Sequence, residues 1–520
     1  MPSGWHGRMK FRMTSLREVQ DGIFSRGIGS TRAGIRVHDR EQEFFLIRAR
    51  VGGKSAMKIR WSSAAAALLL AACCGGVKAS AQTAVPPKTW VDSDTGHRIF
   101  RVSDEPGSSG FYFNVNAYSK DDRTMVYTAP DGIHTMDLAT RKTRLLVPNP
   151  AIAEGASAEE RNRVGNRAIV VGHKTNSVFF SRMDAATKRQ VIYKADLTSG
   201  EVTKLTMLPE RATISTVNAD ETLGAGVYVE TEAGATQEFG RHAARTGPLV
   251  QAEDKSAMME RRLAARIPVV LFTVDLKTGK VKELLHSTDW IGHLLFSPID
   301  PTLLMYCHEG PWHKVDRVWT IRTDGTQNEL RHKRTMLMEI AGHEFWGQDG
   351  ETVWYDWQLP KGEDFWLGAF DVASNKRMAY HMQRDEWSIH FNVNKGATLF
   401  TGDGGDSGQV ARSNAGEWIN LFHPEWRKDE NGLNDPTFWK PGIFHREKLV
   451  NMSHHNYRLE PNVRFSPDSK LIFFTSNLFG PSYVFAVEVA KAAPGASDVQ
   501  STPELGRKFS PDPTPTPADK

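Results

Sequence analysis

Short apolar runs alternate with polar turns along most of this chain, from about Thr89 to Ala490. Runs of this kind, rich in Val, Ile, Leu, Phe and Tyr and bounded by Asp, Asn, Gly and Ser, are typical of β-strands. Seven such runs each follow a turn built on Asp or Asn. The turns contain Asp121, Asn176, Asp220, Asp300, Asp349, Asn394 and Asp468. Most are about 44 to 55 residues apart, and the two wider gaps contain polar segments near 231–266 and 404–440.

Most of the seven units continue into a second hairpin, with clear copies over Ile192–Gly200 and Leu271–Gly279. A repeat of this length built from four short strands is typical of a propeller blade. The pattern therefore predicts an all-β fold, a seven-bladed β-propeller over residues 89–490. A single blade cannot bury both of its faces, so the ring must close before any blade is stable. The segment Glu253–Arg266 has helical character, and we expect it at the rim.

The first 81 residues follow a different pattern. Residues 1–56 are polar and Arg-rich, and we interpret them as a non-structural extension upstream of Met57. Residues 57–81 combine a short positive region, an apolar run over Ala64–Ala72 and an Ala79-Ser80-Ala81 cleavage site, the three parts of a secretory signal peptide. The apolar run is too short for a permanent transmembrane segment. This pattern predicts an exported, periplasmic protein.

A second interpretation of the leader remains open, because Leu70-Ala71-Ala72-Cys73 resembles a lipoprotein box. Acylation of Cys73 would give a membrane-anchored lipoprotein. In either case the product would leave the cytoplasm. Cleavage after Ala81 would leave Cys307 as the one cysteine of the mature chain, which excludes a disulfide-stapled scaffold.

Composition narrows the classes of partner. The formal net charge is +4 over 520 residues, and no basic block with interleaved aromatics is present, which argues against a nucleic-acid partner. The 14 tryptophans suit either a β core or a carbohydrate-binding cleft, because indole faces stack on sugar rings. Residues 491–520 are rich in Pro, Ser and Asp and predict a disordered tail.

Candidate chemistry is concentrated between Trp290 and Trp346, where histidines, acids, an arginine and tryptophans lie at the ends of short predicted strands. Residues from several blades converge at the mouth of a propeller channel. The candidates there are His293, His308, Glu309, Asp316, Arg317, His343, Glu344, His390, Asp403, Asp406, His454, His455, Glu460 and Asn462. A structural role is the alternative for His293 and His343, since a Gly-His pair often holds a blade through a His–Asp hydrogen bond.

Several motifs are absent. The chain contains no Gly-x-Ser-x-Gly elbow, which argues against a serine hydrolase. The predicted mature chain contains no His-Glu-x-x-His or Cys-x-x-Cys metal motif. A metal site built from scattered histidines and carboxylates remains open.

The runs Cys307-His308-Glu309-Gly310-Pro311 and His343-Glu344-Phe345-Trp346 together resemble the oligogalacturonate lyase family. The resemblance covers roughly residues 90–490 and is strongest over 285–405. It implies a seven-bladed propeller that cleaves short pectin fragments by β-elimination, usually with Mn²⁺. It also implies His343 as the catalytic base and Arg317 as a second catalytic residue, although the Val-Asp-Arg spacing is one residue shorter here.

The resemblance implies a metal site with His390 as its first ligand. The other family ligands follow a Gln-x-x-His-x-His pattern, and the same place here has Tyr457, Glu460 and Asn462. Glu460 and Asn462 can still bind a hard divalent ion. On the same basis, His293, His308, Glu309 and Trp312 are expected to bind the oligogalacturonide substrate.

The expected chemistry matches these residue types. β-Elimination removes the proton at C5 of a uronate, which is weakly acidic until the adjacent carboxylate is neutralised. A metal ion or Arg317 can neutralise it, and a neutral imidazole can accept the proton. Two alternatives remain. One is a lyase for a different uronate oligosaccharide, and the other is a non-catalytic propeller binding module of the TolB type.

Overall fold

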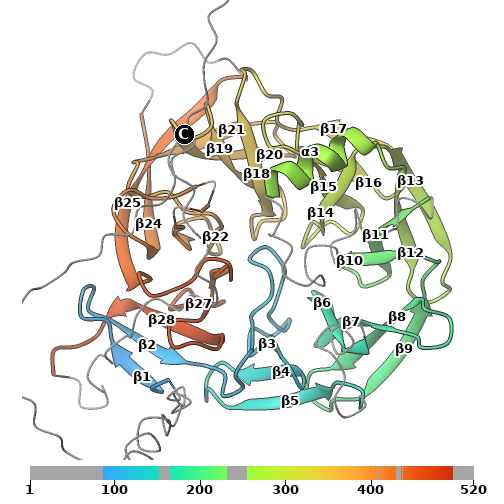
Figure 1. Cartoon of the computed structure of the whole chain (residues 1–520), viewed down its shortest axis with the longest axis horizontal. Helices are drawn as coiled ribbons and strands as arrows, with labels where there is room; N and C mark the ends of the chain where they lie inside the picture. Colours follow the sequence, from blue (N-terminus) through green and yellow to red (C-terminus); the bar gives the residue numbers. More distant parts are fainter. Residues whose placement is uncertain are drawn as a thin grey trace, which may run out of the picture. The chain divides into compact units, whose positions relative to one another are not determined.

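The computed structural model describes residues 86–151, 164–230, 255–406, 408–409, 411–428, 435 and 437–495. Within these ranges the strands form six sheets, one of which contains two blades, and the seven blades are arranged in a ring with consecutive blades side by side (Figure 1). This confirms the all-β fold and the seven-bladed β-propeller. The predicted extension over 1–56, the signal peptide over 57–81, the anchor at Cys73 and the tail beyond residue 495 lie outside the described residues.

The first three blades follow the chain in order. Blade 1 contains β3 (Thr124–Ala129), β4 (Gly132–Asp137) and β5 (Thr143–Pro148). Blade 2 contains β6 (Arg167–Val171), β7 (Ser177–Met183), β8 (Gln190–Asp196) and β9 (Val202–Met207). Blade 3 contains β10 (Thr213–Val217), β11 (Leu223–Val229), β12 (Val269–Asp275) and β13 (Val281–Ser287).

The next three blades carry most of the candidate residues. Blade 4 contains β14 (Trp290–Phe296), β15 (Leu303–Glu309), β16 (Val318–Arg322) and β17 (Glu329–Leu330). Blade 5 contains β18 (Ile340–Trp346), β19 (Thr352–Gln358), β20 (Phe365–Asp371) and β21 (Arg377–Met382). Blade 6 contains β22 (Phe391–Val393), β23 (Phe400–Gly402), β24 (Trp418–Trp426) and β25 (Trp439–Asn451). Parallel pairing of β21 with β25 joins blades 5 and 6 into one sheet.

Blade 7 closes the ring with strands from both ends of the described chain. It contains β26 (Arg464–Phe465), β27 (Leu471–Ser476) and β28 (Tyr483–Lys491), extended by β2 (His97–Arg101) and β1 (Thr89–Val91). β2 pairs antiparallel with β28, placing Ile99 opposite Val487. These hydrogen bonds tie the first strands to the last, so the ring cannot open without breaking a sheet.

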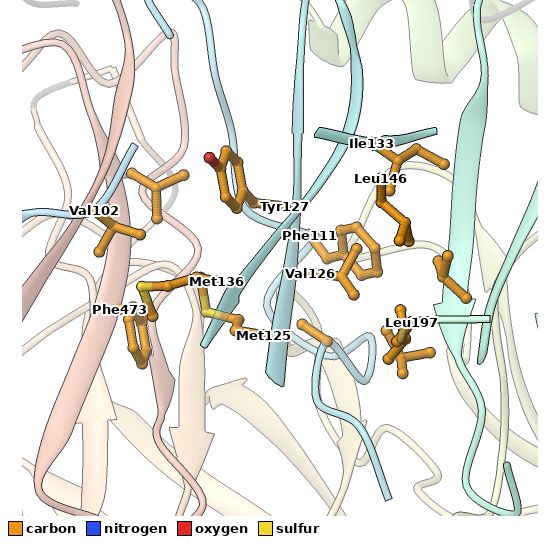
Figure 2. Close-up of a cluster of buried hydrophobic side chains, with 14 of the residues drawn as sticks. Val102, Phe111, Met125, Val126, Tyr127, Ile133, Met136, Leu146, Leu197 and Phe473 are labelled. Atoms are coloured by element: carbon orange, nitrogen blue, oxygen red, sulfur yellow. The ribbon is translucent and has the colours of Figure 1, made fainter. Parts of the chain in front are cut away.

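The core lies between neighbouring blades. In Figure 2, Met125 and Met136 of blade 1 lie near Phe473 of blade 7, while Val126 on the other face lies near Leu197 of blade 2. Successive residues of a strand point to opposite faces, so each blade buries one face against each neighbour. This explains why the apolar runs are nearly continuous.

The recurring turn predicted from sequence is a side-chain-capped loop. Oδ1 of Asn218 accepts hydrogen bonds from the N–H groups of Thr222 and Leu223, each at 2.9 Å. Asn394 accepts in the same way from Thr398 at 3.0 Å and Leu399 at 2.9 Å. An Asn, Asp or Ser side chain that mimics a backbone turn needs only local sequence, so the repeat was visible in the chain.

The predicted helix is confirmed as α3 (Lys255–Ala265), between β11 and β12. It contacts blade 4, because Glu260 pairs with Lys314 at 2.8 Å and Arg262 lies 3.9 Å from the ring centroid of Trp290. No helix of the described ranges is long and apolar enough to cross a membrane.

A buried carboxylate fixes the loop before β18. Glu339 accepts hydrogen bonds from His332 and Trp357, each at 2.8 Å, and from the Met336 N–H at 3.1 Å. Burial favours the neutral form of Glu339, but these donors outweigh it and lower its pKa from 4.5 to about 2. The carboxylate therefore stabilises the fold fully above pH 4.5, and this contribution is lost as the pH falls toward 2.

We expect Glu339→Gln to reduce the free energy of unfolding at pH 7 by on the order of 2 kcal/mol. Urea unfolding at pH 7 and at pH 3 would measure this change. The gap between the variant and the parent should narrow at pH 3. An equal gap at both pH values would contradict the assignment.

Candidate active site

Three neighbouring blades each present one histidine from the innermost strand. His293 lies in β14, His343 lies in β18, and His390 immediately precedes β22 (Figure 1). The rings of His343 and His390 meet edge to face, with centroids 4.8 Å apart. The two histidines that the sequence predicted as base and metal ligand therefore lie in contact.

β-Bulges redirect two of these histidines. The register of β14 against β15 shifts after Gly292, and that of β18 against β19 shifts after Gly342. His293 and His343 have left-handed backbone conformations there, with φ of 49° and 46°. A bulge re-aims a side chain, and left-handed non-glycine residues concentrate at functional sites.

A carboxylate orients His343. Its Nδ1 lies 3.1 Å from Oδ1 of Asp356, which projects from the paired strand β19. Asp356 is buried, whereas 13% of the His343 side chain stays exposed. If Nδ1 donates to the carboxylate, Nε2 is left as a proton acceptor. The contact is the His–Asp strut allowed by the Gly-His motif, and it is also how a general base is oriented.

His390 is buried between carboxylates and a tyrosine. Its Nδ1 lies 2.8 Å from Oδ2 of Asp403, and its Nε2 lies 3.2 Å from the Tyr112 hydroxyl and 3.9 Å from Oε2 of Glu460. Burial acts to lower the pKa of His390, but the Asp403 carboxylate outweighs it and raises that pKa above its usual value.

Tyr112 enters the cluster from the loop between β2 and β3, drawn in blue inside the ring (Figure 1). The buried guanidinium of Arg464 holds this loop by donating to the carbonyls of Phe111, Tyr112 and Val115. Phe113 of the same loop stacks on His390, with centroids 4.6 Å apart. The first and last parts of the propeller thus build one wall of the cluster.

His293 lies in a second group of polar side chains. Its Nε2 is 3.6 Å from Oε1 of Glu309, and its Nδ1 is 3.4 Å from Oε2 of Glu344. Burial lowers the pKa of His293 to about 4, so its imidazole is neutral at pH 7. Gly292 makes room for Glu309, because a Cβ there would lie 2.0 Å from the Glu309 carboxylate.

His293, Cys307 and Glu309 offer three ligand atoms within 4.8 Å of one another, the one such group within the described ranges. This group suits a metal ion poorly. Nη2 of Arg317 lies 3.6 Å from Sγ of Cys307, and burial raises the pKa of the thiol well above its usual value. A metal would need the thiolate and would be repelled by the guanidinium.

Arg317 is buried and paired with Glu344. Its Nε lies 3.0 Å from Oε1, and its Nη2 lies 3.4 Å from Oε2 of the same carboxylate. Burial disfavours the charged form of Glu344, but Arg317 holds the pKa of that carboxyl below its usual value. The guanidinium charge is therefore already balanced inside the protein.

A cleft of about 510 Å³ opens beside His343. Its charged lining residues are Glu460 and three cations, Lys361, Arg384 and Arg412, and Trp312 and Trp387 also line it. The volume lies in the range of about 300–1,000 Å³ that small-molecule sites occupy. Trp312, predicted to bind substrate, is thus in the same cleft as His343 and Glu460.

Other predicted residues lie elsewhere or are engaged differently. His308 points to the opposite face of β15 from Cys307 and Glu309, because successive residues of a strand alternate. Its Nδ1 lies 3.4 Å from Oδ2 of Asp289. Oδ1 of Asn462 accepts from the Phe113 N–H, and its Nδ2 donates to the Glu460 carbonyl. Both ends of this amide serve the backbone, which we interpret as a structural role for Asn462 in place of the predicted ligand role.

His455 and Asp316 are also held structurally. The ring nitrogens of His455 contact Oγ of Ser476 at 3.0 Å and the Leu459 carbonyl at 2.7 Å. Asp316 pairs with Lys333 at 2.5 Å and with Arg334 at 2.9 Å.

Sequence reasoning missed five members of the site: Tyr112, Asp356, Lys361, Arg384 and Arg412. Asp356 stands in an apolar strand, Thr352–Gln358, which is buried along its whole length. A lone carboxylate in such a strand needs a buried partner, and that signal was available. The three cations lie on connections between strands, where charge is expected in any protein.

The fold and the cluster define a class of protein: a seven-bladed propeller with an oriented histidine beside a cationic cleft. The family model for oligogalacturonate lyase matches residues 81–493, so the chain belongs to the oligogalacturonate lyase family.

Curated relatives include an oligogalacturonide lyase of Pectobacterium atrosepticum, 29% identical over 226 residues, and an oligogalacturonate lyase of Dickeya dadantii, 29% identical over 236 residues. Each match covers 42% of this chain and 55% of the relative, so the chain spans about half the length of these relatives.

Solved structures agree on the fold. An oligogalacturonate lyase in complex with manganese superposes with a TM-score of 0.57 at 20% identity, over 78% of this chain and 96% of that one. An oligogalacturonate lyase from Vibrio parahaemolyticus has the same TM-score and coverage at 18% identity.

Proposed function

We propose that this protein is a lyase that cleaves short oligogalacturonides by β-elimination and leaves an unsaturated sugar. Membership of the oligogalacturonate lyase family supports the substrate class. The observation that carries the proposal is the setting of His343, which is oriented by Asp356 and lines a cleft with three cations. An anionic sugar chain and a proton acceptor would meet there.

His343 is the proton acceptor in this proposal. Because its Nδ1 is held by Asp356, its Nε2 can take the C5 proton of the uronate. The bond between C4 and the leaving oxygen O4 then breaks as the C4–C5 double bond forms, and O4 takes a proton from water and departs as a hydroxyl group. The imidazolium that results is stabilised by the adjacent Asp356 carboxylate.

The removed proton lies next to a carboxylate, so its loss requires positive charge nearby. Lys361, Arg384 and Arg412 are the better candidates for this positive charge, because all three line the cleft that would hold the uronate. Arg317 is less suited than the sequence suggested, since Glu344 already balances its charge.

His390 and Glu460 are the residues that would hold a divalent metal ion. The Nδ1 contact with Asp403 directs Nε2 of His390 toward Glu460 and Tyr112, and an imidazole nitrogen with carboxylate and hydroxyl oxygens is a donor set that Mn²⁺ accepts. The ion would neutralise the uronate carboxylate and so acidify the C5 proton.

Ultraviolet absorbance of the unsaturated product tests the proposal. We expect purified protein to produce it from di- and trigalacturonate. EDTA should reduce the rate and Mn²⁺ should restore it. Product formation that is indifferent to EDTA would assign charge neutralisation to the protein's own cations. Absence of product from every galacturonide would overturn the proposed substrate.

Glu460→Ala should lower the bound metal per chain, measured by elemental analysis of the purified protein. Glu260→Ala is the matched control, because Glu260 lies on α3 and pairs with Lys314. Unchanged metal content in Glu460→Ala would remove this carboxylate from the metal site.

A lyase for a different uronate is the second candidate. The presence of Tyr457, Glu460 and Asn462 where the family has Gln, His and His favours it, because the residues beside His390 then differ from the family set. The same absorbance assay with other uronate oligomers distinguishes the two. Binding of uronates without any product would indicate the non-catalytic module.

A further inference from the structure

Two cations in the cleft lie within cation–π range of indole rings. Cζ of Arg384 is 3.9 Å from the ring centroid of Trp387, and Nζ of Lys361 is 6.0 Å from that of Trp312. Cation–π contact fixes a guanidinium flat on its platform. The charges are thus held at the surface of the cleft.

Neither Arg384 nor Lys361 forms an ion pair with a carboxylate in the part of the chain that the structure describes. The Arg384 guanidinium donates to the Arg412 carbonyl and makes no other hydrogen bond within the described ranges. A guanidinium carries five N–H donors in a planar fork that matches a carboxylate. Most of the Arg384 donors are therefore available to a ligand.

Like charges gather here. Burial and the neighbouring Arg412 lower the pKa of Arg384, with Glu363 acting in the opposite direction. Among the described residues, Glu460 is the one carboxylate in the cleft lining. Repulsion between Arg384 and Arg412 costs free energy, and an anion bound beside Arg384 would lower this cost.

We infer that Arg384 and Lys361 form a subsite for the carboxylate of a second uronic-acid unit, separate from the unit that reacts at His343. The inference rests on the proposed function and names the residues that select an acidic chain over a neutral one. Arg384 is the bidentate partner of the carboxylate, and Lys361 contributes a second positive charge. The subsite holds the chain while the neighbouring unit reacts.

Calorimetric titration with trigalacturonate and with the neutral trisaccharide galactotriose tests the subsite. The measurement uses protein with His343→Ala, in which turnover is expected to be about 10²- to 10⁴-fold slower. Arg384→Gln should weaken trigalacturonate binding by about 10- to 100-fold, the loss expected for a hydrogen bond to a charged group. Lys361→Met should weaken it by a smaller factor, and binding of galactotriose should not change.

Two matched controls are available. Arg262 lies 3.9 Å from the Trp290 ring, and Lys440 lies 4.2 Å from the Trp426 ring, and neither pair lines the cleft. Arg262→Gln and Lys440→Met should leave the affinity unchanged. Equal loss in the controls, unchanged affinity in Arg384→Gln, or no binding of trigalacturonate by the parent would each overturn the subsite. Failure of the lyase proposal is measured separately, by the absence of unsaturated product from the wild-type protein.

Discussion

Replacing His343 with alanine is expected to lower kcat/KM on oligogalacturonides by about 10²- to 10⁴-fold, the contribution typical of a general base. The side chain lines the cleft and touches Asp356, His390 and Phe113 at its edges, so its removal leaves the blades intact. The absorbance assay measures the loss, and circular dichroism checks the fold.

Asp356, the carboxylate that orients His343, allows a second test of the same assignment. Asp356→Asn should retain the fold and lose part of the activity, because an amide can hold the imidazole but cannot stabilise its charged form. His445→Ala is the control, since His445 is an exposed histidine paired with Glu425 in blade 6. Normal turnover by His343→Ala would mean that another group takes the proton.

Much of the fold was predictable because its signals are local. Several blades contain a turn in which one side chain caps the next strand, as Asn218 and Asn394 do. Strand alternation then fixes which residues are buried. The closure of blade 7 by β1 and β2 had no such signal, because strand pairing between the two ends of the described chain depends on the whole ring.

The site was predictable only in part, for a physical reason. His343 stands beside a Gly in a run of unusual composition, so the sequence marked it. Its partner Asp356 lies 13 residues away in the paired strand, and Tyr112 reaches His390 across 278 residues. The first contact depends on the register of β18 against β19 within one blade. The second exists only after the ring has closed, and no local pattern encodes it.

Arg317 was correctly singled out in the sequence, but the structure gives it a structural contact in place of the expected catalytic one. The sequence marked it by its place after Val315-Asp316, and the resemblance implied a catalytic role. Within the fold it forms a buried ion pair with Glu344, the acid that directly follows the proposed base. A residue that holds the strand of His343 can be essential for activity without touching the substrate.

The second large effect follows from this pair. Arg317→Met should reduce the free energy of unfolding by about 3–5 kcal/mol, because it leaves the Glu344 carboxylate buried without its counter-charge. Glu344→Met should cost a similar amount by stranding the guanidinium. Urea unfolding of both variants measures these losses. If the free energy of unfolding changes by less than about 1 kcal/mol, the usual contribution of an exposed ion pair, the pair is hydrated.

The double replacement separates stability from catalysis. With Arg317→Met and Glu344→Met together neither charge of this pair is left without its partner, so the stability should recover most of the loss, as in other proteins where apolar residues replace a buried ion pair. If Arg317 acts only by holding β18, turnover should recover with the fold. A stable but inactive double variant would return Arg317 to the catalytic group that the sequence suggested. Because Glu344 neighbours His343, a partial loss of kcat with KM unchanged would instead indicate that the pair sets the position of the base.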